Sequence, residues 1–213
     1  MSRHALLGFA LLGVLACTTP DAPTHTGAYA FDSNGNGTGN VFHWPGDRLP
    51  VRFWVDPRGN MNELVQNAID VWQDQLIYGE FTGVIVSDSA HADVQFVWSG
   101  SVPPTVPPDP GPPALACGGL TQNDSIGADN RIYGALHSSI LVLSGSFTPG
   151  QVEACVRRVT IHEMGHTLGI LAEAPDSTDI MFATPVVPLP SPVDRTTIQV
   201  LYHTAATILP PTR

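Results

Sequence analysis

The amino-acid sequence predicts an α+β domain in which three helices accompany several short strands. Short segments rich in β-branched and aromatic residues, such as Val51–Val55, are bounded by Pro and Asp, which is typical of strands. Longer segments, such as residues 61–78, place apolar residues at helical offsets, which is typical of helices with one buried face. A hydrophobic content of 43% in 213 residues is sufficient for a core and excludes a wholly disordered chain.

The charge balance argues against two classes of partner. Nine basic residues, all of them arginine, stand against 19 acidic residues and give a formal net charge of −10. Nucleic acids and anionic membrane surfaces both require clustered cations, and the sequence contains no such basic run. We therefore expect no binding to nucleic acid and no electrostatic binding to membranes.

The N-terminal segment has the pattern of an export signal. Arg3 precedes an almost entirely apolar run over residues 5–16, which is too short to span a bilayer but is typical of a signal peptide. The run ends in Ala16-Cys17, which resembles a bacterial lipobox, in which the cysteine is lipidated and becomes the new N-terminus. Residues 1–16 are therefore predicted to be a lipoprotein signal peptide. The protein would be an exported lipoprotein of the bacterial cell envelope, with the outer membrane as the expected site. An ordinary signal peptide, and hence a secreted protein, is the alternative.

Two segments of unusual composition flank or interrupt the domain. Residues 17–40 are rich in Thr, Pro, Gly and Asn and are predicted to form a flexible spacer. The alternative is a loop of the domain itself, in which Tyr29 and Phe31 pack. The domain then occupies residues 41–213. Residues 101–113 are so rich in Pro and Gly that we expect a surface insertion without helix or strand.

Further strands and two more helices follow in order. Strands are expected at residues 84–86, 92–98 and 138–143. The second helix is expected to run from the N-cap Thr148, with Gln151 as the partner of a capping box, to a stop near Gly169. The last helix opens with a similar cap-then-Pro signature at residues 191–194.

The second helix carries the residues with the strongest chemical signal. His162-Glu163-Met164-Gly165-His166 places two imidazoles four residues apart, hence on one face of a helix, where they can bind one metal ion. Two nitrogen ligands suit Zn²⁺, which lowers the pKa of a bound water to about 7. Glu163 lies about 100° around the helix and can act as the general base toward that water. This combination indicates peptide-bond hydrolysis.

The surrounding sequence resembles the metzincin zinc endopeptidases. Gly169 follows His166 by three residues, and Met181 lies where metzincins place a methionine-containing turn beneath the metal. The closer resemblance is to the matrixin branch, and it extends over roughly residues 48–204. It implies a twisted mixed sheet with three helices, in which residues 61–76 look like the first matrixin helix, 92–96 the central strand, 139–143 the edge strand beside which substrate lies, and 191–202 the last helix.

The resemblance departs at the third zinc ligand. Matrixins place a His three residues after the Gly, where this chain has Ala172, which offers no ligand atom. They also space that His eight residues before the Met, and Glu173 stands eight residues before Met181. A one-residue insertion would deliver Glu173 to the metal, and a carboxylate is an acceptable zinc ligand. The alternatives are Asp176, Asp179 or no protein ligand at all.

Three cysteines remain to be explained in an exported protein. If Cys17 carries lipid, Cys117 and Cys155 can pair in an oxidising compartment, and the bridge would pin the end of the Pro-rich insertion to the second helix. Two unpaired buried thiols are the alternative.

The sequence as a whole thus predicts a monomeric zinc endopeptidase that cleaves polypeptides. Its rival is a catalytically inactive, metzincin-like binding domain on the cell surface, which Ala172 favours and the retained Glu163 argues against. His91, His137, Asp124 and Asp129 lie near the matrixin loop that holds structural metals, but their spacing does not reproduce that site and no metal is assigned to them.

Overall fold

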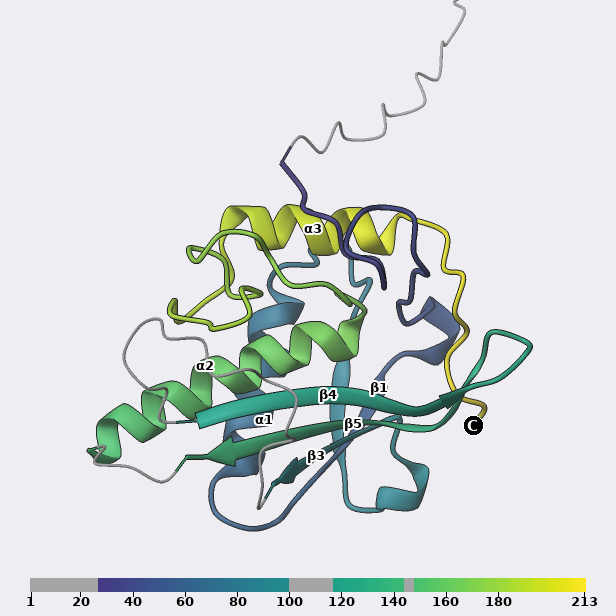
Figure 1. The fold of residues 1–213 in the computed structure, drawn as a ribbon. Helices are drawn as coiled ribbons and strands as arrows, with labels where there is room; N and C mark the ends of the chain where they lie inside the picture. Colours follow the sequence, from purple (N-terminus) through teal and green to yellow (C-terminus); the bar gives the residue numbers. More distant parts are fainter. Residues whose placement is uncertain (1–26, 100–116, 144–147) are drawn as a thin grey trace, which may run out of the picture.

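A computed structural model describes residues 27–99, 117–143 and 148–213 and shows an α+β fold with a five-stranded mixed sheet and three helices in these ranges (Figure 1). The strands are β1 (Val51–Val55), β2 (Gly83–Val86), β3 (Val94–Trp98), β4 (Cys117–Ile126) and β5 (Ile132–Val142). The helices are α1 (Met61–Gln73), α2 (Pro149–Leu168) and α3 (Pro192–Tyr202), with 3-10 turns η1 (Gly46–Arg48) and η2 (Ser89–His91). The predicted fold class is thereby confirmed at this coarse level. The signal peptide, Cys17 and the Pro-rich insertion at 101–113 lie outside the described residues.

The sheet has the strand order β2-β1-β3-β5-β4. Neighbouring strands run parallel except β4, which pairs antiparallel with β5. The register places Phe53 opposite Val94 and Val94 opposite Leu136, so these buried side chains share one face. Side chains of alternate residues, such as Gln95 and His137, therefore point to the opposite face.

Helices α1 and α2 pack against each other and cover one face of the sheet. A side chain at Gly83 of β2 would meet Ile69 of α1, and a side chain at Gly119 of β4 would meet Val159 of α2. Trp72 of α1 ties the two helices together by donating a hydrogen bond from its indole N–H to the carbonyl of Ile161, at 2.8 Å. Helix α2 is therefore held between α1 and the antiparallel end of the sheet.

The edge strand of the sheet is not the predicted one. Residues 139–143 were expected to form the edge, but residues 139–142 belong to β5, which lies between β3 and β4. The edge of the sheet beside α2 is β4, a strand that the sequence did not indicate, since its residues alternate little and most are polar or glycine. Its stability comes from backbone pairing with β5, and such pairing leaves little trace in the sequence.

The first helix is shorter than predicted. Residues 61–78 were expected to be helical, but α1 ends at Gln73 and the next residues form turns with bonds from Gln75 N to the carbonyl of Trp72 and from Leu76 N to that of Gln73. Leu76 stays buried in this turn. Apolar residues therefore keep their helical spacing beyond Gln73, because the turn that follows α1 packs on the same core as the helix.

The segment before the domain is partly packed on it. Residues 27–40, the described part of the expected flexible spacer, form the loop that the sequence offered as the alternative. The carbonyl of Phe31 accepts a bond from Leu171 N at 2.8 Å, and the hydroxyl of Tyr29 donates to Asp194 at 2.7 Å. Tyr29 and Phe31 are therefore hydrogen-bonded to the domain, as the alternative of a packed loop expects.

Candidate metal centre

Helix α2 brings the two predicted histidines together. Its N-terminus has the predicted capping box between Thr148 and Gln151, and its C-terminus ends at Gly169 in the left-handed conformation with φ of 112°. Because His162 and His166 are four residues apart on one helix, their side chains meet, and their Nε2 atoms lie 3.1 Å apart. His162 is buried and His166 is half-buried, so both imidazoles are largely shielded from solvent.

Backbone carbonyls fix the orientation of both imidazoles. The Nδ1 atom of His162 lies 2.9 Å from the carbonyl oxygen of Ile180, and the Nδ1 atom of His166 lies 2.6 Å from that of Ile170. A carbonyl can only accept, so each Nδ1 carries the proton and donates it. Each Nε2 is then the ring nitrogen that can bind a metal ion once it carries no proton.

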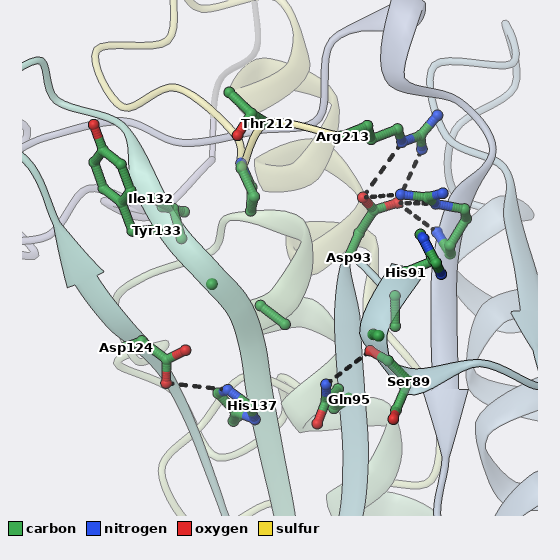
Figure 2. A pocket seen from close by; sticks show the side chains of 16 residues that line it. Ser89, His91, Asp93, Gln95, Asp124, Ile132, Tyr133, His137, Thr212 and Arg213 are labelled. Carbon is green, nitrogen blue, oxygen red and sulfur yellow. Dashed lines mark hydrogen bonds and ion pairs between the residues drawn. The ribbon is translucent and has the colours of Figure 1, made fainter.

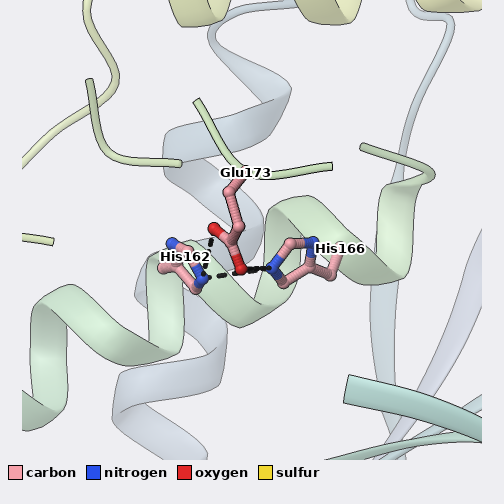
Figure 3. A group of neighbouring side chains, drawn as sticks. All are labelled: His162, His166 and Glu173. Carbon is pink, nitrogen blue, oxygen red and sulfur yellow. Dashed lines mark hydrogen bonds and ion pairs between the residues drawn. The ribbon is translucent and has the colours of Figure 1, made fainter. Parts of the chain in front are cut away.

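Glu173 completes a cluster of three possible metal ligands (Figure 3). Its carboxylate oxygens lie 3.6 Å from His162 Nε2 and 3.5 Å from His166 Nε2, and the three donor atoms all lie within 4.8 Å of one another. The loop after α2 presents this carboxylate because it closes on itself, with Ala174 N donating to the carbonyl of Met181 at 2.7 Å. No other group of three such residues occurs in the ranges that the structure describes.

The two imidazoles and the carboxylate change one another's protonation. Burial lowers the pKa of His162, and the neighbouring His166 lowers it further. Burial also opposes protonation of His166, but its hydrogen bond with Glu173 and the nearby carboxylates raise the pKa of His166 to about 9. Burial raises the pKa of Glu173, yet His166 outweighs burial and holds this pKa below its ordinary value. A cation entering the cluster would have to displace the proton on His166.

The alternative third ligands lie apart from this cluster. Asp176 is exposed and accepts hydrogen bonds from Thr178, while Asp179 is buried and accepts one from the Ser191 hydroxyl. Neither carboxylate belongs to the group of converging donors. Of the candidates weighed from the sequence, the structure brings only Glu173 to the two histidines.

Glu163 points from α2 toward the sheet rather than into the cluster. Its side chain is buried, and its Oε2 atom accepts a 2.6 Å hydrogen bond from the hydroxyl of Thr121 on β4. The backbone at Gly119 passes so close that any side chain there would overlap Glu163. The carboxylate therefore lies between the edge strand and the helix that carries the histidines.

Met181 lies directly beneath the histidine helix. A side chain at Gly165, between the two histidines, would overlap the sulfur of Met181, which is fully buried. Asp194 fixes this turn by accepting hydrogen bonds from the backbone N–H groups of Ile180 and Met181, at 2.8 and 3.4 Å. The same turn supplies the Ile180 carbonyl that orients His162.

The predicted disulfide is confirmed. Cys117 and Cys155 are bonded, with their Cα atoms 5.9 Å apart. The bridge joins the first residue of β4 to α2, seven residues before His162. It therefore fixes the edge strand against the helix that presents the candidate ligands, rather than only closing the preceding loop.

The other singled-out histidines lie on the opposite face of the sheet. A cavity of about 400 Å³ is lined by His91, His137 and Asp124, together with Asp93 and Arg213 (Figure 2). His137 pairs with Asp124 at 3.1 Å, but no third metal-binding side chain in the described ranges joins them. Asp129 does not line this cavity and pairs with Arg131. Within the described residues, the structure therefore offers no second candidate metal site beside the cluster on α2.

Some residues around the centre escaped the sequence analysis. Thr121, Gly119 and Asp194 contact the HExxH helix or the turn beneath it from strands and helices far away in the sequence. Asp194 could have been noticed as the N3 residue of a capping box after Ser191. Thr121 and Gly119 gave no such signal, because β4 itself was not predicted.

Two comparisons with known proteins identify no relative of the chain. No protein-family profile matches the chain, and a search of curated proteins finds no match. Within residues 27–99, 117–143 and 148–213, no helix combines the length and the apolar character needed to cross a bilayer.

Proposed function

We propose that the protein is a zinc-dependent endopeptidase of the metzincin type. The observation that carries this proposal is the convergence of His162, His166 and Glu173 within 4.8 Å of one another, above a buried methionine turn. The HExxH spacing, the stop at Gly169 and the position of Met181 beneath α2 all support the same family.

The donor set fits a zinc ion. Two imidazole nitrogens and one carboxylate are the ligand types found in catalytic zinc sites, which leave a further position open for water or substrate. The Nδ1 protons donated to the Ile180 and Ile170 carbonyls leave both Nε2 lone pairs directed at the same place. A single anionic ligand would partly neutralise the dication. His162, His166 and Glu173 would therefore hold the ion.

The residues around the site have separable roles in hydrolysis. When bound, zinc would lower the pKa of a water molecule and polarise the substrate carbonyl. Glu163 would take the proton of the attacking water and pass it to the leaving amine. The outer edge of β4 would bind an extended substrate by adding it as a further strand, so that the scissile bond runs past Glu163.

A binding domain without catalysis remains the second candidate, because Ala172 stands where matrixins carry their third ligand. Such a domain would need neither the buried Glu163 nor the carboxylate that the loop after α2 directs at the histidines. These two acids favour the enzyme.

Two variants distinguish the general base, Glu163, from the zinc ligand, Glu173. Glu163→Gln should retain zinc and the fold but lower the cleavage of an unfolded protein substrate by about 10²–10⁴-fold, the usual contribution of general acid–base catalysis. Glu173→Ala should lower zinc affinity, because the anionic ligand is lost. Asp176→Ala, an exposed acid of the same loop, is the matched control and should change neither quantity. A wild type with neither zinc nor cleavage would favour the binding domain instead.

We also propose that the protein is anchored to the cell envelope through Cys17. The proposal rests on the apolar run and the Ala16-Cys17 pair of the sequence. Palmitate labelling followed by membrane fractionation should show a labelled, membrane-bound wild type and an unlabelled, released Cys17→Ser variant. An unlabelled wild type would contradict the anchor and leave a secreted enzyme.

A further inference from the structure

The carboxylate of Glu163 is held by a hydroxyl from the opposite layer of the fold. Thr121 on β4 lies 42 residues before Glu163 in the sequence, yet its Oγ1 lies 2.6 Å from Glu163 Oε2 and 3.3 Å from the Glu163 carbonyl oxygen. A hydrogen bond to a charged acceptor is shorter and stronger than one between neutral groups. The contact therefore fixes one oxygen of the carboxylate to the edge strand.

A second hydroxyl stands behind the first. Ser138 of β5 is the cross-strand partner of Thr121 in the sheet, and the two hydroxyl oxygens lie 3.1 Å apart. The side chain of Ser138 is fully buried, and Thr121 is the hydrogen-bond partner found for it among the described residues. A hydroxyl has one proton. Since Thr121 donates its proton to Glu163, Ser138 must donate to Thr121, and the two bonds reinforce each other.

The neighbouring glycine completes the arrangement. Gly119 lies two residues before Thr121, hence on the same face of β4. A Cβ atom at this position would overlap Oε1 and Cγ of Glu163, so the space that the side chain occupies exists only because residue 119 is glycine. No hydrogen bond from the described part of the chain reaches Oε1. One carboxylate oxygen is thus anchored by a hydroxyl, and the other lies against Gly119 of the edge strand.

We propose that Thr121 and Ser138 are positioning residues for Glu163: their hydroxyl chain anchors Oε2 so that Oε1 stays free to exchange the proton of the reaction. This inference rests on the proposed function, because it assigns Glu163 the role of the base. Without the Thr121 hydroxyl, a glutamate with three rotatable bonds could turn away from the reacting atoms. Small misplacements of a catalytic group can cost up to about 100-fold in rate.

The test compares variants at position 121 that differ in the hydroxyl or in the methyl group. Thr121→Val keeps the shape and removes the hydroxyl, and it should lower kcat by about 10–100-fold with KM and bound zinc unchanged. Thr121→Ser keeps the hydroxyl and should restore most of this loss. Ser138→Ala should lower kcat less, because the Thr121 bond remains. Thr196→Val, at a half-buried threonine of α3 whose hydroxyl donates to the Pro192 carbonyl of the same helix, is the matched control and should leave kcat unchanged.

A measurement without metal or substrate tests the same contact. In the metal-free protein, Thr121→Val and Glu163→Ala should each lower the melting temperature, and the double variant should lower it by clearly less than the sum, because both remove one shared bond. Additive losses would overturn the contact. Unchanged kcat in Thr121→Val, with an active wild type, would overturn the positioning role alone. An inactive wild type would overturn the proposed function and the positioning role with it.

Discussion

Asp194 should be one of the most sensitive positions outside the metal cluster. Its side chain is fully buried at the start of α3 and accepts hydrogen bonds from Ser191 N, Ile180 N and the Tyr29 hydroxyl, at 2.8, 2.8 and 2.7 Å. Burial and the Asp194 carboxylate raise the pKa of Tyr29, which keeps that hydroxyl a donor. One carboxylate thus joins the N-terminal segment, the methionine turn and the last helix.

The cost of Asp194→Ala follows from the donors that it would leave without an acceptor. A buried donor without a partner costs about 1–3 kcal/mol, and loss of the capping-box carboxylate adds up to about 1 kcal/mol. Partial relaxation of the structure would let water bind one of the donors left without an acceptor. We therefore expect the free energy of unfolding to fall by about 4 kcal/mol. In a domain of this size each kcal/mol lowers the melting temperature by about 2–4 °C, hence about 8–16 °C in total.

Urea unfolding of the metal-free protein at pH 7 measures this loss. Asp176→Ala removes an exposed carboxylate of the neighbouring loop and should cost less than about 1 kcal/mol. Zinc affinity should also fall in Asp194→Ala, by about 10–100-fold, because the Ile180 carbonyl that orients His162 is displaced. A loss of stability below about 1 kcal/mol in Asp194→Ala would show that the Asp194 carboxylate does not hold these segments together.

Three further changes test other parts of the structure. Replacing Cys117 and Cys155 together by Ser should destabilise the protein by about 4 kcal/mol on the chain-entropy model for a loop of 38 residues, measured by urea unfolding, and reducing agent should then have no further effect. Gly169→Ala should destabilise by more than about 1 kcal/mol, since φ is 112° and the new methyl group would overlap the Phe42 carbonyl; a silent variant would contradict this geometry. Burial raises the pKa of Asp93, but hydrogen bonds from Arg213 and Arg52 outweigh burial and hold this pKa below its ordinary value. The stability that Asp93 contributes is therefore present above about pH 4 and is lost as the pH falls through the lowered pKa of the folded state. The difference in melting temperature between wild type and Asp93→Asn should accordingly shrink as pH falls from about 5 to about 2.

The sequence predicted those elements whose local signals agree with their packing. The capping box at Thr148, the cap-then-Pro start at Ser191, the stop at Gly169 and strand β1 appear where the residues placed them. Each of these features is specified by residues that lie close together in the sequence. The histidine pair belongs to the same class, since the i, i+4 spacing alone brings both imidazoles to one face.

Features that depend on long-range pairing were missed or misplaced. The polar strand β4 exists because β5 supplies its hydrogen bonds, so the edge of the sheet was assigned to residues 139–143 instead. The Thr121 contact with Glu163 could not be foreseen once that strand was missing. Glu173, in contrast, was predicted through its spacing to Met181, and the structure places its carboxylate beside the two histidines.

Anomalous diffraction at the zinc absorption edge, from crystals of the protein loaded with zinc, would locate the ion and identify its three protein ligands. We expect one peak about 2.0–2.2 Å from the Nε2 atoms of His162 and His166 and from an oxygen of Glu173. A crystal without a peak on α2, or a peak whose third protein ligand is Asp176 or Asp179, would contradict this expectation.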